Sequence, residues 1–264
     1  ESENIKVNYF GNPLIDIVNE KKSIENNNEN YENQKNFYEK NFLIGIMPGS
    51  RISEIKNILP IIIKLLNILI EKSKTNLELK SKLDNIKFVL ILAENIDEDF
   101  LKLNFSKFSE NEKYSKFFNI VEIVKGPAYI LRQKMKFILT SSGTSSFENT
   151  ILGIPMMIFY KLDLFSYNFA KLIIKIPFIG MPNILAKKMI MPEYIQKFNF
   201  DKILNEIIRW ILDENCLKNK KNELENVIRC FNIQDDSKNT DKHQRIIDKI
   251  SDFILKFDIL KNKK

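Results

Sequence analysis

Glycine and proline are scarce in this chain, which has only 7 Gly and 8 Pro among 264 residues. Sandwiches and barrels built from many short strands need frequent tight turns, and those turns need Gly and Pro. The sequence therefore argues against these all-β classes. Hydrophobic residues make up 44% of the chain, which is enough to bury one large core with an appended segment.

Cysteine and histidine are nearly absent, with two Cys and one His. Cys216 and Cys230 have no partners at the spacing of metal ligands, and as free thiols they are expected in a reducing cytosol. His243 lies in a charged stretch, so we do not expect catalysis by a His base or a triad. Residues 97–99 (Asp-Glu-Asp) are acidic, but such residues commonly open a helix. We predict no metal site and no cofactor.

The chain lacks any strong excess of negative charge: its net charge is +7 and its pI is about 9.1. This favours anionic partners, but Lys and Arg are scattered rather than clustered, so we predict no nucleic-acid binding. No apolar run reaches the roughly 18 residues of a membrane span. Residues 162–184 mix aromatic, aliphatic and Lys side chains. They are interpreted either as a membrane- or acyl-facing surface or as helices that cover a sheet.

What the chain does have is an alternation of short apolar runs with helical patterns. Apolar runs bounded by turn residues predict buried strands, and five are expected, at residues 43–47, 87–93, 119–124, 137–140 and 155–159. This alternation predicts an α/β fold with a Rossmann-like, doubly wound parallel sheet and helices on both faces. In such sheets, ligands bind at the carboxyl ends of the strands.

The organisation along the chain follows from composition. Residues 20–41 are rich in Asn and Glu and predict a low-complexity linker or a loose helix. Residues 42–198 form the predicted sheet domain. Residues 199–264 contain helical patterns only and predict a C-terminal helical extension, with Asn199 or Asp201 capping its first helix.

A first candidate loop, Pro48-Gly49-Ser50-Arg51, connects a predicted strand to a predicted helix. Gly49 permits close backbone approach to a ligand, Ser50 is expected to cap the helix, and the free amides of a helix start attract anions. Arg51 adds a permanently charged donor suited to phosphate. The alternative is an ordinary capped helix with a surface Arg.

A second candidate loop, residues 141–148 (SSGTSSFE), also lies between a strand and a helix. Its small hydroxyl residues and Gly143 can cradle a diphosphate, and Glu148 can accept hydrogen bonds from a ribose diol. The alternative is a capping box between Ser145 and Glu148, which requires no ligand.

Four blocks of the sequence resemble lipid-A-disaccharide synthase in order and spacing: GNPLID (11–16), PGSRISEI (48–55), SGTSSFENTILGIPMMIFYK (142–161) and PNILAKKMIMPEYIQ (182–196). The resemblance implies the C-terminal, donor-binding lobe of a two-lobed GT-B glycosyltransferase that needs no metal. Such enzymes transfer diacylglucosamine from its UDP derivative to diacylglucosamine 1-phosphate, with inversion, and release UDP.

The resemblance assigns roles to particular positions. The diphosphate would lie against Gly49, Ser50, Arg51, Ser142, Gly143 and Thr144. Glu148 would hold the ribose. The donor site near the second lobe would be shaped by Asn183, Glu193 and Gln196. Residues 1–19 would join the lobes, with a hinge at Gly11, Asn12, Pro13 and Asp16. The departures are Asn12, where many members have His, Lys187, where Gly is usual, and Phe147, where Leu is usual.

The resemblance also implies what lies outside these residues. An N-terminal lobe of the same enzyme would bind the lipid monosaccharide phosphate acceptor and supply the general base, so this chain by itself is expected to bind the donor and turn over poorly. A cytoplasmic location is expected, with association at the inner membrane surface and a homodimer left open. The alternatives are a non-catalytic UDP-sugar-binding remnant, or another GT-B enzyme such as a peptidoglycan glucosaminyltransferase or a UDP-sugar epimerase. A last alternative is a membrane-surface interaction protein, which would bind liposomes without binding UDP.

Overall fold

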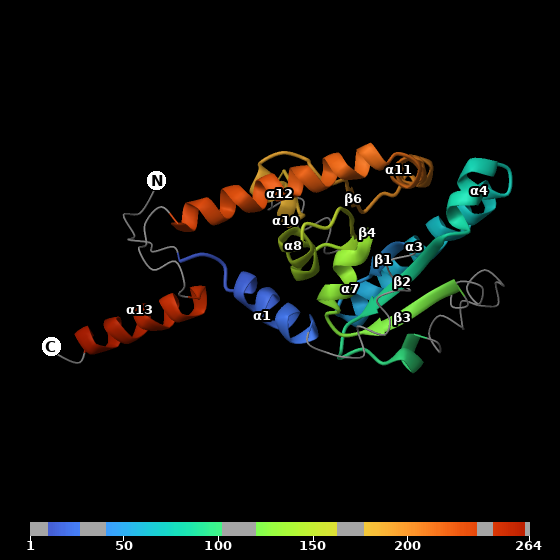
Figure 1. The fold of residues 1–264 in the computed structure, drawn as a ribbon. Coiled ribbons are helices and arrows are strands. Elements are labelled where there is room, and N and C mark those ends of the chain that lie inside the picture. Colours follow the sequence, from blue (N-terminus) through green and yellow to red (C-terminus); the bar gives the residue numbers. More distant parts are fainter. Residues whose placement is uncertain (1–9, 27–40, 102–119, 163–176, 237–244, 262–264) are drawn as a thin grey trace.

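The computed structural model describes residues 10–26, 41–101, 120–162, 177–236 and 245–261. Its centre is a six-stranded sheet in which every neighbouring pair is parallel (Figure 1). The strands are β1 (Phe42–Met47), β2 (Ile86–Leu92), β3 (Val121–Lys125), β4 (Met135–Ser141), β5 (Met156–Tyr160) and β6 (Glu193–Ile195). Their spatial order is β3-β2-β1-β4-β5-β6. This is the Rossmann-like sheet expected from the sequence.

Both faces of the sheet are buried, and this explains the apolar runs. Alternate residues of β1 point to opposite faces: Ile44 and Ile46 lie in the larger core cluster, whereas Leu43 and Met47 lie in the smaller one. A strand covered on both faces needs apolar residues at nearly every position rather than at every second position. Each fully buried Leu or Ile side chain contributes roughly 1.5–3 kcal/mol.

Helices form the two outer layers. Residues of α3 (Ile52–Ser73), α4 (Leu77–Leu83), α11 (Phe200–Leu212) and α12 (Glu214–Asp236) belong to the larger core cluster. On the other face, α7 (Tyr129–Lys134) and α8 (Thr144–Ile151) follow β3 and β4, and α1 (Leu14–Asn26) packs against them both. A short helix, α10 (Met181–Ala186), precedes β6 and contacts α8 and α12.

The five expected strands are all present, with ends that differ by one or two residues. The sequence did not predict β6, which has only three residues, none of them buried. Asn199 caps α11, accepting a hydrogen bond from the Lys202 amide at 3.0 Å, as expected. The expected boundary between residues 19 and 20 falls inside α1, and residues 27–40 lie outside the described residues. The division into four segments remains a prediction.

The predicted hinge residues begin α1. Asn12 Oδ1 accepts from the Leu14 amide at 3.0 Å, and Gly11 has a φ of 99°, a conformation that favours glycine. Asp16 is one turn into the helix, and its Oδ2 accepts from the Ile247 amide at 3.0 Å. Ile247 is in the first turn of α13 (Ile246–Lys261), so Asp16 caps a helix that lies far along the chain.

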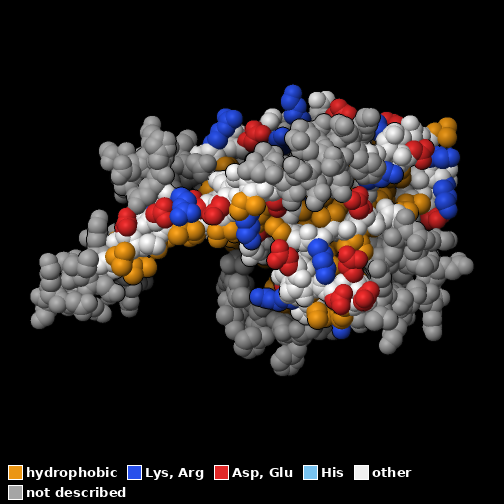
Figure 2. All heavy atoms as spheres, turned by 60° about the horizontal axis from the view of Figure 1, so that its bottom comes forward, with side chains coloured by type: hydrophobic (Ala, Val, Ile, Leu, Met, Phe, Trp, Pro, Cys, Tyr) orange, Lys and Arg blue, Asp and Glu red, His pale blue; other side chains and the backbone are white. Residues whose placement is uncertain are grey.

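The helix α13 projects from the body of the molecule next to α1 (Figure 1). Figure 2 shows hydrophobic side chains gathered along one side of this projecting arm. Among the α13 residues whose side chains the structure describes, Phe253, Ile254 and Leu255 are apolar and exposed. Among the helices that the structure describes, none is long and apolar enough to cross a membrane.

Candidate functional site

The sheet has one topological switch point, between β1 and β4. The chain moves from β1 through β2 to β3 in one direction, and from β4 through β5 to β6 in the other. Connections therefore diverge from the carboxyl ends of β1 and β4, and the crevice between them is where ligands bind in open parallel sheets. Both candidate loops, residues 48–51 and 142–144, follow these two strands. The fold brings them to one place.

The loop after β1 is held by Glu54. Ser50 donates its backbone N–H to Glu54 Oε2 at 3.0 Å, and the Ser50 carbonyl accepts from Asn95 Nδ2 at 3.1 Å. Gly49 has a φ of 129°, and a Cβ there would collide with the Glu54 side chain. Glycine is therefore required at position 49 both by the backbone conformation and by the neighbouring carboxylate.

The expected cap by the Ser50 side chain is wrong. The N-cap of α3 is Arg51, and it makes no side-chain cap bond, because Glu54 reaches back from the first turn to bind the loop. The Arg51 side chain is 79% exposed and 3.5 Å from Glu54 Oε1. Such exposed ion pairs are weak, so the guanidinium is available to an anion at the start of α3.

The loop after β4 turns at Gly143, which has a φ of 140° and open space where a Cβ would be. Ser142 is held by its backbone and by its side chain. Its amide donates to the Phe159 carbonyl at 3.0 Å, and its Oγ donates to the Ile179 carbonyl at 3.1 Å. Thr144, the first residue of α8, is exposed. The loop is therefore held in place through Ser142, while Gly143 and Thr144 are exposed.

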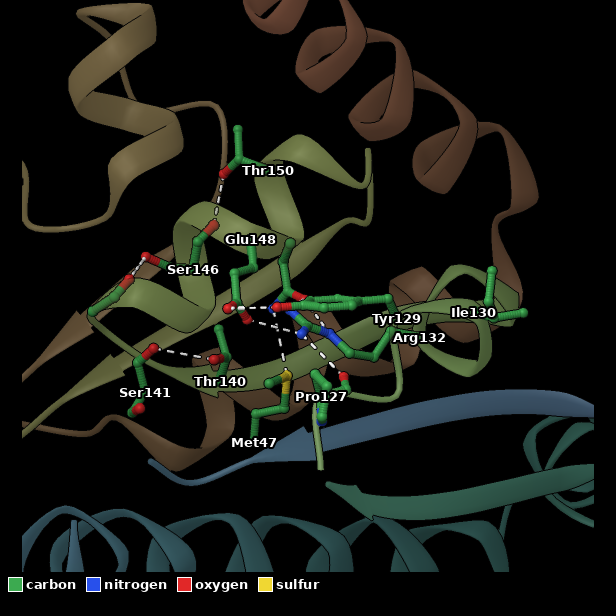
Figure 3. Close-up of polar contacts among 12 residues, drawn as sticks. Met47, Pro127, Tyr129, Ile130, Arg132, Thr140, Ser141, Ser146, Glu148 and Thr150 are labelled. Atoms are coloured by element: carbon green, nitrogen blue, oxygen red, sulfur yellow. Dashed lines mark hydrogen bonds and ion pairs between the residues drawn. The ribbon is translucent and has the colours of Figure 1, made fainter. Parts of the chain in front are cut away.

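The alternative interpretation of this loop, a capping box between Ser145 and Glu148, is not what the structure shows. Gly143 is the N-cap of α8 and has no side-chain cap bond, while Ser146 Oγ donates to the Gly143 carbonyl at 2.7 Å. The Glu148 carboxylate instead points to α7, where it binds Arg132 and Tyr129 (Figure 3). The capping interpretation of this loop is therefore excluded.

A buried polar network surrounds Glu148. Arg132 Nη1 donates to Glu148 Oε2 at 2.9 Å, and Tyr129 Oη donates to Glu148 Oε1 at 3.0 Å. Arg132 Nε and Nη2 both donate to Asn149 Oδ1. The Arg132 side chain is 0% exposed and that of Glu148 17%. Burial lowers the pKa of Arg132, and the charge of Glu148 opposes this effect. Burial and the charge of Glu148 both raise the pKa of Tyr129. The Tyr129 hydroxyl therefore stays protonated and remains a donor near neutral pH.

The third group of expected site residues acts as internal support. Asn183 is fully buried and uses its whole amide: Nδ2 donates to the Met191 carbonyl and Glu193 Oε1, and Oδ1 accepts from the Ile190 and Met191 amides. Glu193 also accepts from the Ile179 and Gly180 amides at 2.9 and 2.8 Å. These two side chains hold the segment whose Ile179 carbonyl accepts from Ser142, so the structure shows them bonded within the chain.

Gln196 joins the ends of β5 and β6. Its Nε2 donates to the Leu162 carbonyl at 3.0 Å, and its Oε1 accepts from the Leu162 amide at 3.1 Å. Lys187 ends α10 with a φ of 53°, a left-handed conformation that favours Gly. Residues 163–176, part of the stretch interpreted as acyl-facing or core, lie outside the described residues.

The chain is similar in sequence to proteins of known family. The sequence model of the family described as lipid-A-disaccharide synthetase matches residues 1–249. This chain belongs to that family. The lipid-A-disaccharide synthase of a Sulfurihydrogenibium species is 32% identical over 233 residues, 85% of this chain and 55% of that protein. That of Persephonella marina is 27% identical over 227 residues, 86% of this chain and 55% of that protein. The chain therefore spans about half the length of the curated relatives it matches.

A solved structure, UDP-GlcNAc 2-epimerase of Methanocaldococcus jannaschii in complex with UDP-GlcNAc and UDP, is similar with a TM-score of 0.48 and 16% identity. That match covers 88% of this chain and 56% of the epimerase.

Membership of the lipid-A-disaccharide synthetase family confirms the resemblance drawn from the four sequence blocks. The sequence analysis did not single out four residues that contact the candidate site residues or their partners: Glu54, Tyr129, Arg132 and Asn149. Glu54 could have been identified from the sequence, since it is acidic and lies in the first turn of a helix after a candidate loop. Arg132 could not, because its partners Glu148 and Asn149 come from another helix 16 and 17 residues away.

Across the ranges that the structure describes, no three His, Cys, Asp or Glu side chains are grouped so as to hold a metal ion. Asp97 Oδ1 accepts from the Asp99 amide at 3.1 Å, which is the helix-opening role expected for an acidic residue there. His243 lies outside the described residues.

Proposed function

We propose that this chain binds the UDP part of a UDP-diacylglucosamine donor, as the donor-binding half of a lipid A-forming glycosyltransferase. The observation that carries the proposal is the pairing of two glycine-turned loops, at Gly49 and Gly143, across the switch point between β1 and β4. A diphosphate fits between them because each loop precedes a helix whose first amides carry partial positive charge.

The proposed contacts divide the donor among these loops. The diphosphate lies against the start of α3 and Arg51 on one side, and against Ser142 and Thr144 on the other. The Glu148 carboxylate accepts the ribose hydroxyls. Departure of UDP develops negative charge, and fixed donors aimed at that charge lower the barrier without rearrangement. We propose that the reaction needs no metal ion and proceeds with inversion at the sugar.

The remaining partners belong to the same proposal. The acceptor is a lipid monosaccharide phosphate, which binds together with the general base on an N-terminal lobe of the same enzyme. We place the reaction in the cytoplasm, with the enzyme peripheral on the inner membrane. Flotation with anionic vesicles tests the membrane contact, and ultracentrifugation tests the homodimer. A purified 264-residue chain that forms product by itself would contradict the need for the other lobe.

Calorimetric titration with UDP, in the presence of EDTA, tests the donor site. Arg51→Ala removes a charged hydrogen bond worth about 1.5–3 kcal/mol, so we expect UDP binding to weaken tenfold or more; Glu148→Ala should weaken it comparably. Arg229, whose side chain is 74% exposed on α12, is the matched control, and Arg229→Ala should bind normally. A folded chain that does not bind UDP would contradict the proposal.

Gly49→Ala should weaken UDP binding about tenfold or more, because the loop must move to relieve both the φ of 129° and the collision with Glu54. Gly153→Ala is the control: its φ is 67° and a Cβ there meets no atom within 4 Å. It carries backbone strain without touching the loop, so it should lower the melting temperature and leave the UDP affinity unchanged. Equal affinities for the two variants would mean that the Gly49 loop is not the anion site.

A further inference from the structure

We propose that Arg132 is a positioning residue: with Tyr129 it fixes the Glu148 carboxylate as the acceptor for the ribose hydroxyls, and so sets the preference for ribonucleotides over nucleotides without those hydroxyls. This inference rests on the proposed function, because Glu148 must face the donor ribose. Arg132 and Tyr129, both in α7, would affect nucleotide binding through Glu148 without touching the nucleotide.

The hydrogen bonds leave little freedom to Glu148. One oxygen accepts from Arg132 at 2.9 Å and the other from Tyr129 at 3.0 Å, so neither oxygen can rotate without losing a bond. An ionised carboxylate has about four lone-pair sites, and these two bonds leave about two, which is what a vicinal diol requires. The side chain is 17% exposed, so part of it is open to a ligand.

Arg132 is itself held from several directions. Its Nη1 also donates to the Pro127 carbonyl at 3.2 Å, and its Nε donates to Asn149 Oδ1 at 3.1 Å. Asn149 Nδ2 in turn reaches Met47 Sδ at 3.7 Å, at the last residue of β1 and next to the Gly49 loop. Figure 3 shows Arg132 in contact with Pro127 and Glu148, and it places Met47 of β1 nearby. A chain of contacts through Arg132 and Asn149 thus connects Glu148, the proposed ribose acceptor, to the end of β1 beside the proposed diphosphate loop.

Stability alone is a weak reason for this arrangement. A buried ion pair is often no more stable than apolar side chains of similar volume. A planar guanidinium does offer several donors in a rigid fork, which an apolar residue does not, and it can orient Glu148 and Asn149 together. Orientation of an acceptor is therefore the property that this buried Arg supplies.

The test compares UDP with 2′,3′-dideoxy-UDP by calorimetry, for the unchanged chain, Arg132→Lys and Tyr129→Phe. The unchanged chain is expected to bind UDP at least about tenfold more tightly than the dideoxy compound. Arg132→Lys keeps the charge but lacks the fork, and Tyr129→Phe loses only the hydroxyl. Both should bring this ratio close to one while the dideoxy affinity stays unchanged. Arg209→Lys, at a side chain 62% exposed on α11, should leave both affinities unchanged.

The outcomes separate this inference from the proposed function. If both variants lower the affinities for UDP and 2′,3′-dideoxy-UDP equally, the ratio of the two affinities is unchanged. Arg132 and Tyr129 then have a structural role only, and the inference is overturned. If the unchanged chain binds UDP without preferring ribose, the inference also fails while the donor site stands. If the folded, unchanged chain does not bind UDP, the proposed function fails first. Should Arg132→Lys not fold, Tyr129→Phe decides the matter, because it removes a single hydroxyl.

Discussion

Arg132→Ala is expected to lower the free energy of unfolding by about 3–5 kcal/mol, measured by urea denaturation. The guanidinium is fully buried and pairs with Glu148 at 2.9 Å. Removing it leaves the carboxylate without its cation and takes both donors from Asn149 Oδ1. Each buried acceptor left without a donor costs about 1–3 kcal/mol, and the cavity adds to this loss.

Two further variants make this result specific. Arg229→Ala removes a guanidinium 4.0 Å from Glu225 on an exposed helix face, and should change stability by no more than about 0.5 kcal/mol. Arg132→Met combined with Glu148→Met removes both charges. Its loss of unfolding free energy should be smaller than the sum of the losses caused by the two single changes. A loss below about 1 kcal/mol for Arg132→Ala would contradict the buried ion pair.

Trp210→Ala is expected to cost about 3–5 kcal/mol of unfolding free energy. Trp210 is completely buried, and its ring centroid lies 5.3 Å from that of Phe137 in β4, with the two rings in a T-shaped arrangement. Its Nε1 donates to Glu206 Oε1 at 2.9 Å within α11. The large ring fills the space between α11 and the sheet, so an alanine leaves a cavity that the surrounding strands cannot close.

The control for this change is Leu77→Ala, at a side chain 84% exposed, with an expected effect of no more than about 0.5 kcal/mol. Thermal unfolding followed by circular dichroism should show one transition for both variants, at a lower temperature for Trp210→Ala. A separate early transition for Trp210→Ala would mean that α11 folds independently of the sheet, and that the boundary expected near residue 198 divides two folding units.

The strands were predictable because their signal is local. Runs such as FLIGIM and IKFVLIL are apolar at nearly every position, and only a sheet buried on both faces needs that pattern at this length. The strand β6 escaped prediction because its three residues are half-buried or exposed. Pairing with β5 defines it, and such pairing cannot be read from a segment of three residues.

The helix starts show the limit of local rules. Ser50, and Ser145 with Glu148, match the capping patterns, yet neither cap forms. In each case a carboxylate has a different partner: Glu54 binds the Ser50 amide, and Glu148 binds Arg132. Asn199 does cap its helix as expected, because its side chain accepts from the Lys202 amide.

The sequence by itself determined the α/β class, five strands, the two glycine loops and the family, because periodicity and motifs depend on neighbours along the chain. The tertiary structure decided which loops meet. The order β3-β2-β1-β4-β5-β6 brings residues 48–51 beside residues 142–144, and the approach of α7 to α8 gives Glu148 its buried cation. These contacts join residues far apart in sequence, so their energies depend on packing and burial, which no local pattern encodes.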